Sequence, residues 1–181
     1  MDNGASSYRR FLDGEKSAFD EIVNEYFRAL VFFINGYLHD VYESEDVAIE
    51  VLSDLWAYRK YNFKVSLKTY LFMVGKSKAI DRMRKKSTRT ALPLEEVACR
   101  SDDEAELERL VLDSEKKRRI KQAIDSLNEQ MRIAIHLAYF ENMSYKEIAK
   151  VMKIKLKQVD NLLYRAKKEL KELLLEDGDL F

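Results

Sequence analysis

The spacing of apolar residues along the first half of the chain predicts three helices. In residues 18–38 apolar side chains recur in pairs every three to four positions, which is the period of one helix face. Ser44 can cap a second helix, because a serine oxygen accepts a hydrogen bond from an unpaired amide of the first turn. Ser66 can cap a third helix, which the pattern extends to about residue 86.

The helical pattern fails over residues 87–103, which include Pro93, the only proline. A proline disfavours helical backbone in the residue before it. We therefore predict a first helical domain at residues 1–90 and a second at residues 113–181. The connection between them, residues 91–112, is expected to be a flexible linker.

Helical spacing resumes in the second half of the chain. Asn128 can cap a helix to about residue 141, and Ser144 with Glu147 has the spacing of a capping box. A last helix is expected over residues 156–175. No stretch alternates with the period of a strand, so the predicted fold is all-α. It consists of two small helical domains joined by a flexible linker, and the second contains a helix-turn-helix.

The composition agrees with a folded, helical, cytoplasmic protein. Apolar residues make up 46% of the chain and charged residues 35%, and there are only five glycines. The single cysteine, Cys99, excludes an internal disulfide and suits a reducing compartment. The longest apolar run, residues 29–34, is far shorter than a membrane span. The first residues lack the basic and apolar regions of a signal peptide.

Charge is strongly segregated along the chain although the formal net charge is zero. Residues 63–90 contain nine Lys or Arg and one Asp, whereas residues 91–114 contain two Lys or Arg and eight Asp or Glu. From residue 115 to the end, fifteen basic residues face eleven acidic ones. Two basic regions on either side of an acidic strip indicate two contacts with nucleic acid.

Residues 144–170 have the pattern of a helix-turn-helix, in which the last helix reads DNA. At 100° per residue Leu156, Val159 and Leu163 lie on its packing side. Asn161 lies on the opposite side, and its amide can bond adenine at two positions. The candidate DNA-reading residues are Lys155, Lys157, Gln158, Asn161, Tyr164, Arg165 and Lys168.

The turn of this motif lacks the usual glycine. Lys153 occupies the place where a left-handed residue is often needed, and Lys155 stands where a capping Ser or Thr is common. Asp160 lies on the flank of the basic face, where it can pair with neighbouring lysines or accept from a cytosine amino group. A solvated helical hairpin remains the alternative interpretation.

Residues 127–174, "LNEQMRIAIHLAYFENMSYKEIAKVMKIKLKQVDNLLYRAKKELKELL", resemble the fourth conserved region of bacterial sigma factors of the extracytoplasmic-function group. Residues 18–86 resemble the second conserved region. There "AFDEIVNEYFRALVFFINGYL", "SEDVAIEVLSDLW" and "SLKTYLFMVGKSKAIDRMRKK" follow in the order of the family. The resemblance implies an alternative sigma factor that binds core RNA polymerase and promoter DNA. It also implies regulation by an anti-sigma factor.

In that family the helix resembling residues 44–56 docks on the coiled coil of the largest polymerase subunit. Acids beside an apolar stripe suit a partner helix that carries Arg or Lys. Ile49 stands where the family usually has Gln. The candidate polymerase-binding residues are Glu43, Asp46, Ile49, Glu50 and Asp54.

The third helix and the loop before it are the candidate minus-ten interface. Lys78, Arg82 and Lys85 recur on one helix face and can follow phosphates. The resemblance implies that the loop captures a base flipped out of the duplex, and aromatic rings stack on such bases. The loop candidates are Tyr61, Asn62, Phe63 and Lys64.

The sequence offers no pattern for catalysis, a metal or another cofactor. His39 near Glu43, Asp46 and Glu50 lacks the paired Glu-x-x-His helices of carboxylate-bridged metal sites. There is no Gly-rich phosphate loop, and no small-molecule substrate is expected. Two alternatives remain open: a helix-turn-helix regulator that binds duplex operator DNA without polymerase, and a helical adaptor that binds only protein.

Overall fold

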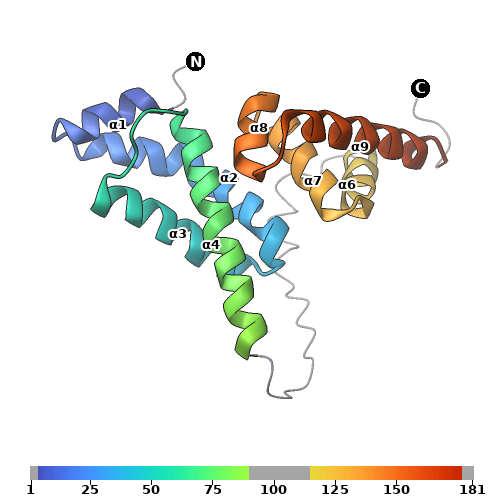
Figure 1. Ribbon diagram of the computed structural model, residues 1–181, viewed down its shortest axis with the longest axis horizontal. Coiled ribbons are helices and arrows are strands. Elements are labelled where there is room, and N and C mark those ends of the chain that lie inside the picture. The colour runs from blue at the N-terminus through green and yellow to red at the C-terminus, as the bar shows by residue number, and fades with distance from the viewer. Residues whose placement is uncertain (1–3, 90–114, 177–181) are drawn as a thin grey trace. The chain divides into compact units, whose positions relative to one another are not determined.

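The computed structural model describes residues 4–89 and 115–176, and every element in these ranges is helical (Figure 1). The all-α prediction is therefore confirmed. The first range contains α1 (Ala5–Leu12), α2 (Ser17–Leu38), α3 (Val41–Tyr58) and α4 (Leu67–Arg89). The second contains α6 (Glu115–Ser126), α7 (Glu129–Ile135), the π-helical turn η1 (His136–Phe140), α8 (Tyr145–Met152) and α9 (Leu156–Glu176).

These helices form two compact units, the first with α1 to α4 and the second with α6, α7, η1, most of α8 and α9. The predicted linker, residues 91–112, lies outside the described residues. Within residues 4–89 and 115–176, none of the helices combines the length and the hydropathy of a membrane span.

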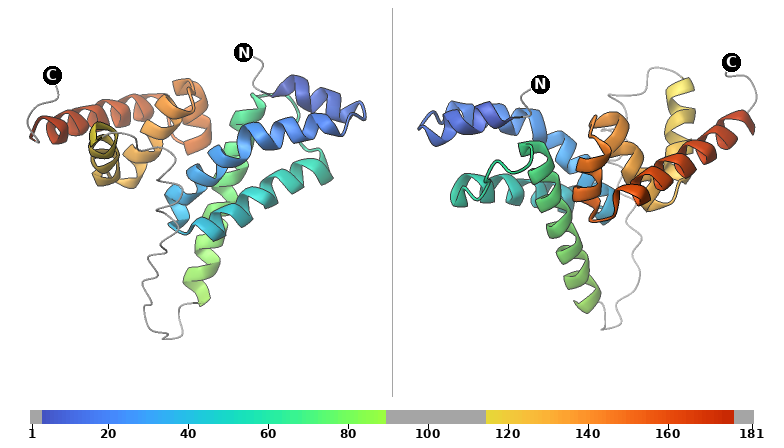
Figure 2. Two further views of the ribbon diagram at one scale, coloured as in Figure 1. Left: turned by 180° about the vertical axis from the view of Figure 1, so that it is seen from behind. Right: turned by 45° about the horizontal axis from the view of Figure 1, so that its top comes forward.

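Helix α2 forms the centre of the first unit, where it packs against α1, α3 and α4, and α4 crosses the α2–α3 pair (Figure 2). Its apolar pairs bury Ile22, Leu30 and Ile34 completely, as the helical spacing predicts. Gly75 of α4 lies at the contact with α2. A β-carbon at this position would lie 3.4 Å from the Ile34 side chain.

Helix α3 begins four residues earlier than predicted, so the proposed Ser44 cap was wrong. Asp40 is the N-cap, and its carboxylate accepts a hydrogen bond from the Glu43 amide at 3.0 Å. Ser44 is buried in the first turn and donates to the Asp40 carbonyl at 2.6 Å. Asp and Ser can both cap a helix. Because the Val41 side chain is buried, the helix begins at Val41 and Asp40 becomes its cap.

The predicted caps of three other helices are confirmed. The Ser66 hydroxyl accepts from the Thr69 amide at 3.2 Å at the start of α4. Asn128 accepts from the Met131 amide at 3.0 Å at the start of α7. Ser144 and Glu147 form the predicted capping box of α8, in which the Glu147 carboxylate accepts from the Ser144 amide at 3.0 Å.

The turn between α8 and α9 has the conformation expected from the sequence. Lys153 adopts a left-handed backbone, with φ of 53°, which costs about 1–2 kcal/mol relative to glycine. Lys155 has no capping hydroxyl, but the Gln158 side chain reaches back and accepts from the Lys155 amide at 2.8 Å. Helix α9 is therefore capped from within its own first turn.

Packing of α9 follows the predicted face except at its first residue. Val159, Leu163 and Ala166 are buried against the rest of the second unit. Leu156, expected on the same packed side, is 47% exposed. The angular position of a residue predicts its side of the helix, but it does not predict how far the neighbouring helices extend along that side.

Candidate partner and nucleic-acid interfaces

Helix α3 presents two chemically different flanks on either side of its buried face. Its acidic flank, which carries Glu43, Glu50 and Asp54, faces α4 and forms ion pairs with it. Its apolar flank, which carries Ile49 and Trp56, faces α2. The predicted polymerase-binding residues are thus divided between the flanks, and exposed Asp46 projects away from the core.

Four ion pairs join the acidic flank to α4. Glu50 lies 2.6 Å from Arg82 and 3.3 Å from Lys78, and Lys78 also lies 2.9 Å from Asp54. Lys86 lies 3.5 Å from Glu43. The acids predicted to bind polymerase therefore pair with the cations predicted to bind phosphates. This pairing was not anticipated from the sequence, because nothing in it indicates that α3 and α4 lie side by side.

The environment of Lys78 keeps its ammonium group charged. Desolvation by burial lowers the pKa of Lys78, but hydrogen bonds to Asp54 and Glu50 outweigh it, and the pKa lies above its usual value. Of the predicted basic stripe, Lys78 and Arg82 are occupied by these acids, whereas Lys85 is exposed.

We expect the α3–α4 ion pairs to contribute modestly and measurably to stability. The charge reversal Glu50→Arg brings a third cation beside Lys78 and Arg82, and it should lower the free energy of unfolding by about 1 kcal/mol, as these groups are partly exposed. Adding Arg82→Glu should recover part of this loss, because a cation and an acid again face each other. Urea titration at low salt measures both effects.

Asp46→Arg provides the control for this prediction, because it places the same charge on α3 but away from α4. It should change the free energy of unfolding by no more than about 0.5 kcal/mol. A double variant less stable than Glu50→Arg alone would contradict the pairing.

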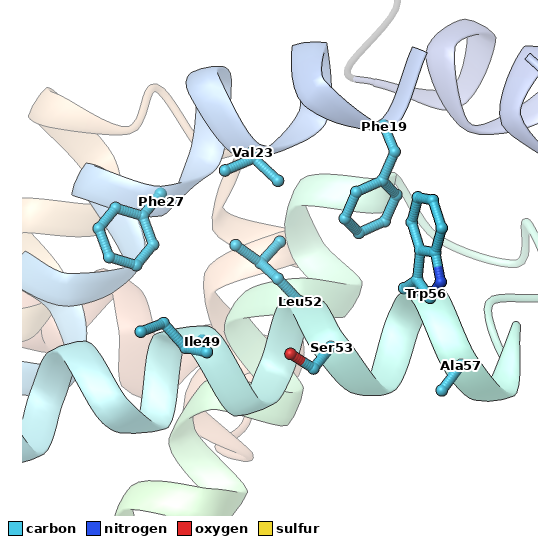
Figure 3. A pocket seen from close by; sticks show the side chains of 8 residues that line it. All are labelled: Phe19, Val23, Phe27, Ile49, Leu52, Ser53, Trp56 and Ala57. Atoms are coloured by element: carbon cyan, nitrogen blue, oxygen red, sulfur yellow. The ribbon is translucent and has the colours of Figure 1, made fainter. Parts of the chain in front are cut away.

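The apolar flank of α3 and the facing side of α2 form an open groove of about 640 Å³ (Figure 3). Phe19, Val23 and Phe27 of α2 line one side, and Ile49, Leu52 and Trp56 of α3 line the other. Ile49 is 53% exposed, and Trp56 is 41% exposed. An exposed apolar groove of this kind is characteristic of a surface that binds another protein.

The loop between α3 and α4 has one of its candidate rings in the core. Tyr61 is only 5% exposed, and its hydroxyl donates to the Val65 carbonyl at 2.7 Å. Among the loop candidates Tyr61 is therefore a core residue, because its ring fills the space beside Tyr8 and Tyr70. Phe63 is 38% exposed, and Asn62 and Lys64 are exposed.

The candidate DNA-reading residues of α9 form one solvent-exposed surface. Lys157, Asn161, Tyr164, Arg165 and Lys168 are all exposed, as is Lys155 just before the helix. Gln158 is also exposed, but its side-chain oxygen is engaged in the cap. The arrangement leaves the Asn161 amide accessible to a base edge in the major groove.

Comparison with known sequences identifies both units. Residues 22–89 match the family described as sigma-70 region 2, and residues 117–170 match that described as sigma-70, region 4. The chain belongs to the sigma-70 family. It is homologous to sigma factors of the extracytoplasmic-function group, as the resemblance implied, and it is an alternative sigma factor that directs transcription initiation.

Two curated relatives match almost the whole of this sigma factor. RNA polymerase sigma-H factor of Pseudomonas aeruginosa is 29% identical over 89% of the chain and 88% of its own length. The ECF RNA polymerase sigma factor SigW of Bacillus subtilis is 25% identical over 89% of the chain and 91% of its own length.

Two solved structures share the fold of this sigma factor. One is the sigma factor RpoE, in complex with the anti-sigma factor NepR, from Bartonella quintana. It has a TM-score of 0.65 and 22% identity over 90% of this chain and 98% of that chain. The other is CnrH in complex with the cytosolic domain of CnrY, with a TM-score of 0.62 and 21% identity over 97% of both chains.

Two features of the first unit were missed by sequence reasoning. Helix α1 was not predicted, although Tyr8 and Phe11, three residues apart, mark its buried side. It lies before the residues that match region 2. The α2–α3 groove was missed as well, because the sequence does not show which side of α3 faces α2.

Proposed function

We propose that this sigma factor binds core RNA polymerase through the apolar flank of α3. Ile49 and Trp56 provide exposed apolar surface over the groove, and Asp46 provides an exposed acid beside them. A partner helix with an apolar stripe and a flanking Arg or Lys complements this surface. The observation that carries the proposal is the exposed groove on the helix that matches the polymerase-docking helix of the family.

In this proposal Glu43, Glu50 and Asp54 act differently from Asp46. Their ion pairs with α4 support a role in holding the two helices together. They reach polymerase only if its cations compete with those of α4. The polymerase contact therefore depends chiefly on the groove and on Asp46.

We propose that the first unit reads the minus-ten element and that the second reads the minus-thirty-five element. The loop residues Asn62, Phe63 and Lys64, with Lys85 of α4, are exposed for the first contact. For the second contact, Asn161 provides base recognition, and the surrounding lysines, Arg165 and Tyr164 provide contacts with the backbone. Binding energy separates the strands, and the chain performs no catalysis of its own.

We also propose domain boundaries at residues 90 and 113, action in the cytoplasm and control by an anti-sigma factor. The two units support the boundaries. RpoE shares the fold of this chain and was solved in complex with the anti-sigma factor NepR. This complex supports the proposal that an anti-sigma factor also binds this chain.

Co-elution of the purified chain with core polymerase from its own organism tests the proposal. We expect a stable complex that selects and transcribes promoter fragments, whereas the chain without polymerase selects none. If the chain instead failed to bind polymerase but selected duplex DNA by itself, it would act as a conventional operator-binding regulator.

A further inference from the structure

Helix α1 packs against the loop that joins α3 to α4. Tyr8 is fully buried, with its ring centre 5.2 Å from that of Tyr61 and 5.9 Å from that of Phe63. The guanidinium carbon of Arg9 lies 5.1 Å from the centre of the Phe63 ring, within the range of a cation–π contact. Helix α1 therefore forms one side of the loop, although it precedes the residues that match region 2.

The backbone at Phe63 is in an unfavourable conformation for its side chain. Its φ is 60°, in the left-handed region that bulky residues seldom adopt and that glycine adopts freely. The fold nevertheless holds a phenylalanine there and leaves its ring 38% exposed. Strained positions cluster at ligand-binding sites, and the exposed part of this ring is accessible to a ligand.

The loop is held in shape by its own hydrogen bonds. The Tyr61 hydroxyl donates to the Val65 carbonyl, and the Asn62 side chain accepts from the Lys64 amide at 3.2 Å. The Phe63 ring packs against the buried Tyr61 ring, and this contact holds it in place. A rigid ring binds a ligand at a lower entropic cost than a mobile one.

The surroundings of the ring are basic. Arg59, Lys60 and Lys64 are exposed, as is Arg9, and residues 59–66 contain no acid. The Lys60 ammonium forms a second cation–π contact, 5.0 Å from the centre of the exposed Tyr58 ring. Exposed aromatic rings among cations are the combination that binds single-stranded nucleic acid, through base stacking and phosphate attraction.

We infer that α1 belongs to the single-strand binding site and that Arg9 is a DNA-contacting residue. An unpaired base stacks on the exposed part of the Phe63 ring. The planar Arg9 guanidinium, held beside that ring, binds the phosphate of the same nucleotide through two of its N–H groups. This inference rests on the proposed function, in which the loop receives a flipped base of the minus-ten element.

Fluorescence anisotropy of the full chain with a labelled, random-sequence 12-nucleotide single strand tests the inference. Arg9→Ala should weaken binding about 10-fold, as expected for losing one charge-assisted contact with a phosphate. Arg9→Lys should recover only part of the loss, because lysine keeps the charge but lacks the planar fork. Arg10→Ala is the matched control, because the neighbouring Arg10 is paired with Glu15 and Glu21 and should change affinity less than about twofold.

Phe63→Gly separates binding from stability. Glycine relieves the strain of the left-handed backbone and so offsets part of the ring contacts that are lost with Tyr8 and Tyr61. The urea midpoint should therefore change little while single-strand affinity falls by about 10-fold. A parallel loss of stability and affinity would assign the ring a packing role and overturn the inference.

Three further outcomes would also overturn the inference. In the first, Arg9→Ala binds the single strand as tightly as the unchanged chain. In the second, the unchanged chain does not bind the single strand. In the third, Arg9→Ala loses affinity for core polymerase and not for the single strand. Failure of the proposed function would give a different result from these three outcomes. The unchanged chain would then not co-elute with core polymerase, whatever its affinity for the single strand.

Discussion

Ile49→Arg should weaken binding of the sigma factor to core polymerase by about 100-fold, as expected for an interface hot spot. Ile49 is 53% exposed over the α2–α3 groove. An arginine there removes apolar contact and places a cation where the proposed partner helix carries its own. The folded chain should tolerate the change, because the side chain projects into solvent. Co-elution and titration with labelled core polymerase measure the effect.

Phe32→Arg is the matched control for this variant. Phe32 lies on α2, is 54% exposed and does not line the groove. The same substitution there should leave polymerase affinity within about threefold of the unchanged value. Equal losses in both variants would indicate a general effect of added charge, and no loss at Ile49 would exclude the groove as the docking surface.

The structure also explains why Glu50→Arg is a poor first test of polymerase binding. Glu50 pairs with Arg82 and Lys78 of α4, so its reversal disturbs the α3–α4 contact before any partner is added. Ile49 lies on the opposite flank of α3 and avoids this complication.

Asn161→Ala should reduce recognition of the minus-thirty-five element by about 5- to 150-fold at one base position, the range for losing a two-point contact with adenine. Asn161 is exposed near the start of α9, so we expect its loss to leave the packing of the helix intact. The reduction should disappear on promoter fragments in which that base pair is changed. Binding of the polymerase complex to fragments with single base-pair changes measures this dependence.

Lys168→Ala provides the contrasting variant on the same helix face, two turns beyond Asn161. Lys168 is exposed and only weakly paired with Glu172, at 3.8 Å. Loss of a phosphate contact should weaken all fragments alike and reduce the salt dependence of binding. An Asn161→Ala variant that behaved in the same uniform way would have no role in base reading.

Local signals in the sequence predicted the start of three helices correctly and that of α3 wrongly. Ser66, Asn128 and Ser144 cap helices as expected, because a capping bond spans only three residues. At α3 the predicted cap was Ser44, whereas the observed cap is Asp40. The outcome depended on the burial of Val41 against other helices, which local chemistry does not reveal.

Tyr61 and Phe63 illustrate a similar limit in the loop. Both are aromatic residues within one basic segment, and local sequence does not distinguish them. In the folded chain Tyr61 is buried, whereas Phe63 is held partly exposed beside Arg9. The difference arises from α1, a separate helix that packs against this loop.

The sequence by itself determined the helical class, the two units, the family and the basic face of α9. These features follow from periodicity, capping and motif order, which are local along the chain. Only the tertiary structure decided that Glu50 and Asp54 pair with Lys78 and Arg82, that Ile49 lies over a groove, and that Arg9 lies over Phe63. Each of these depends on which helix faces another, and that is set by packing between residues distant in the sequence.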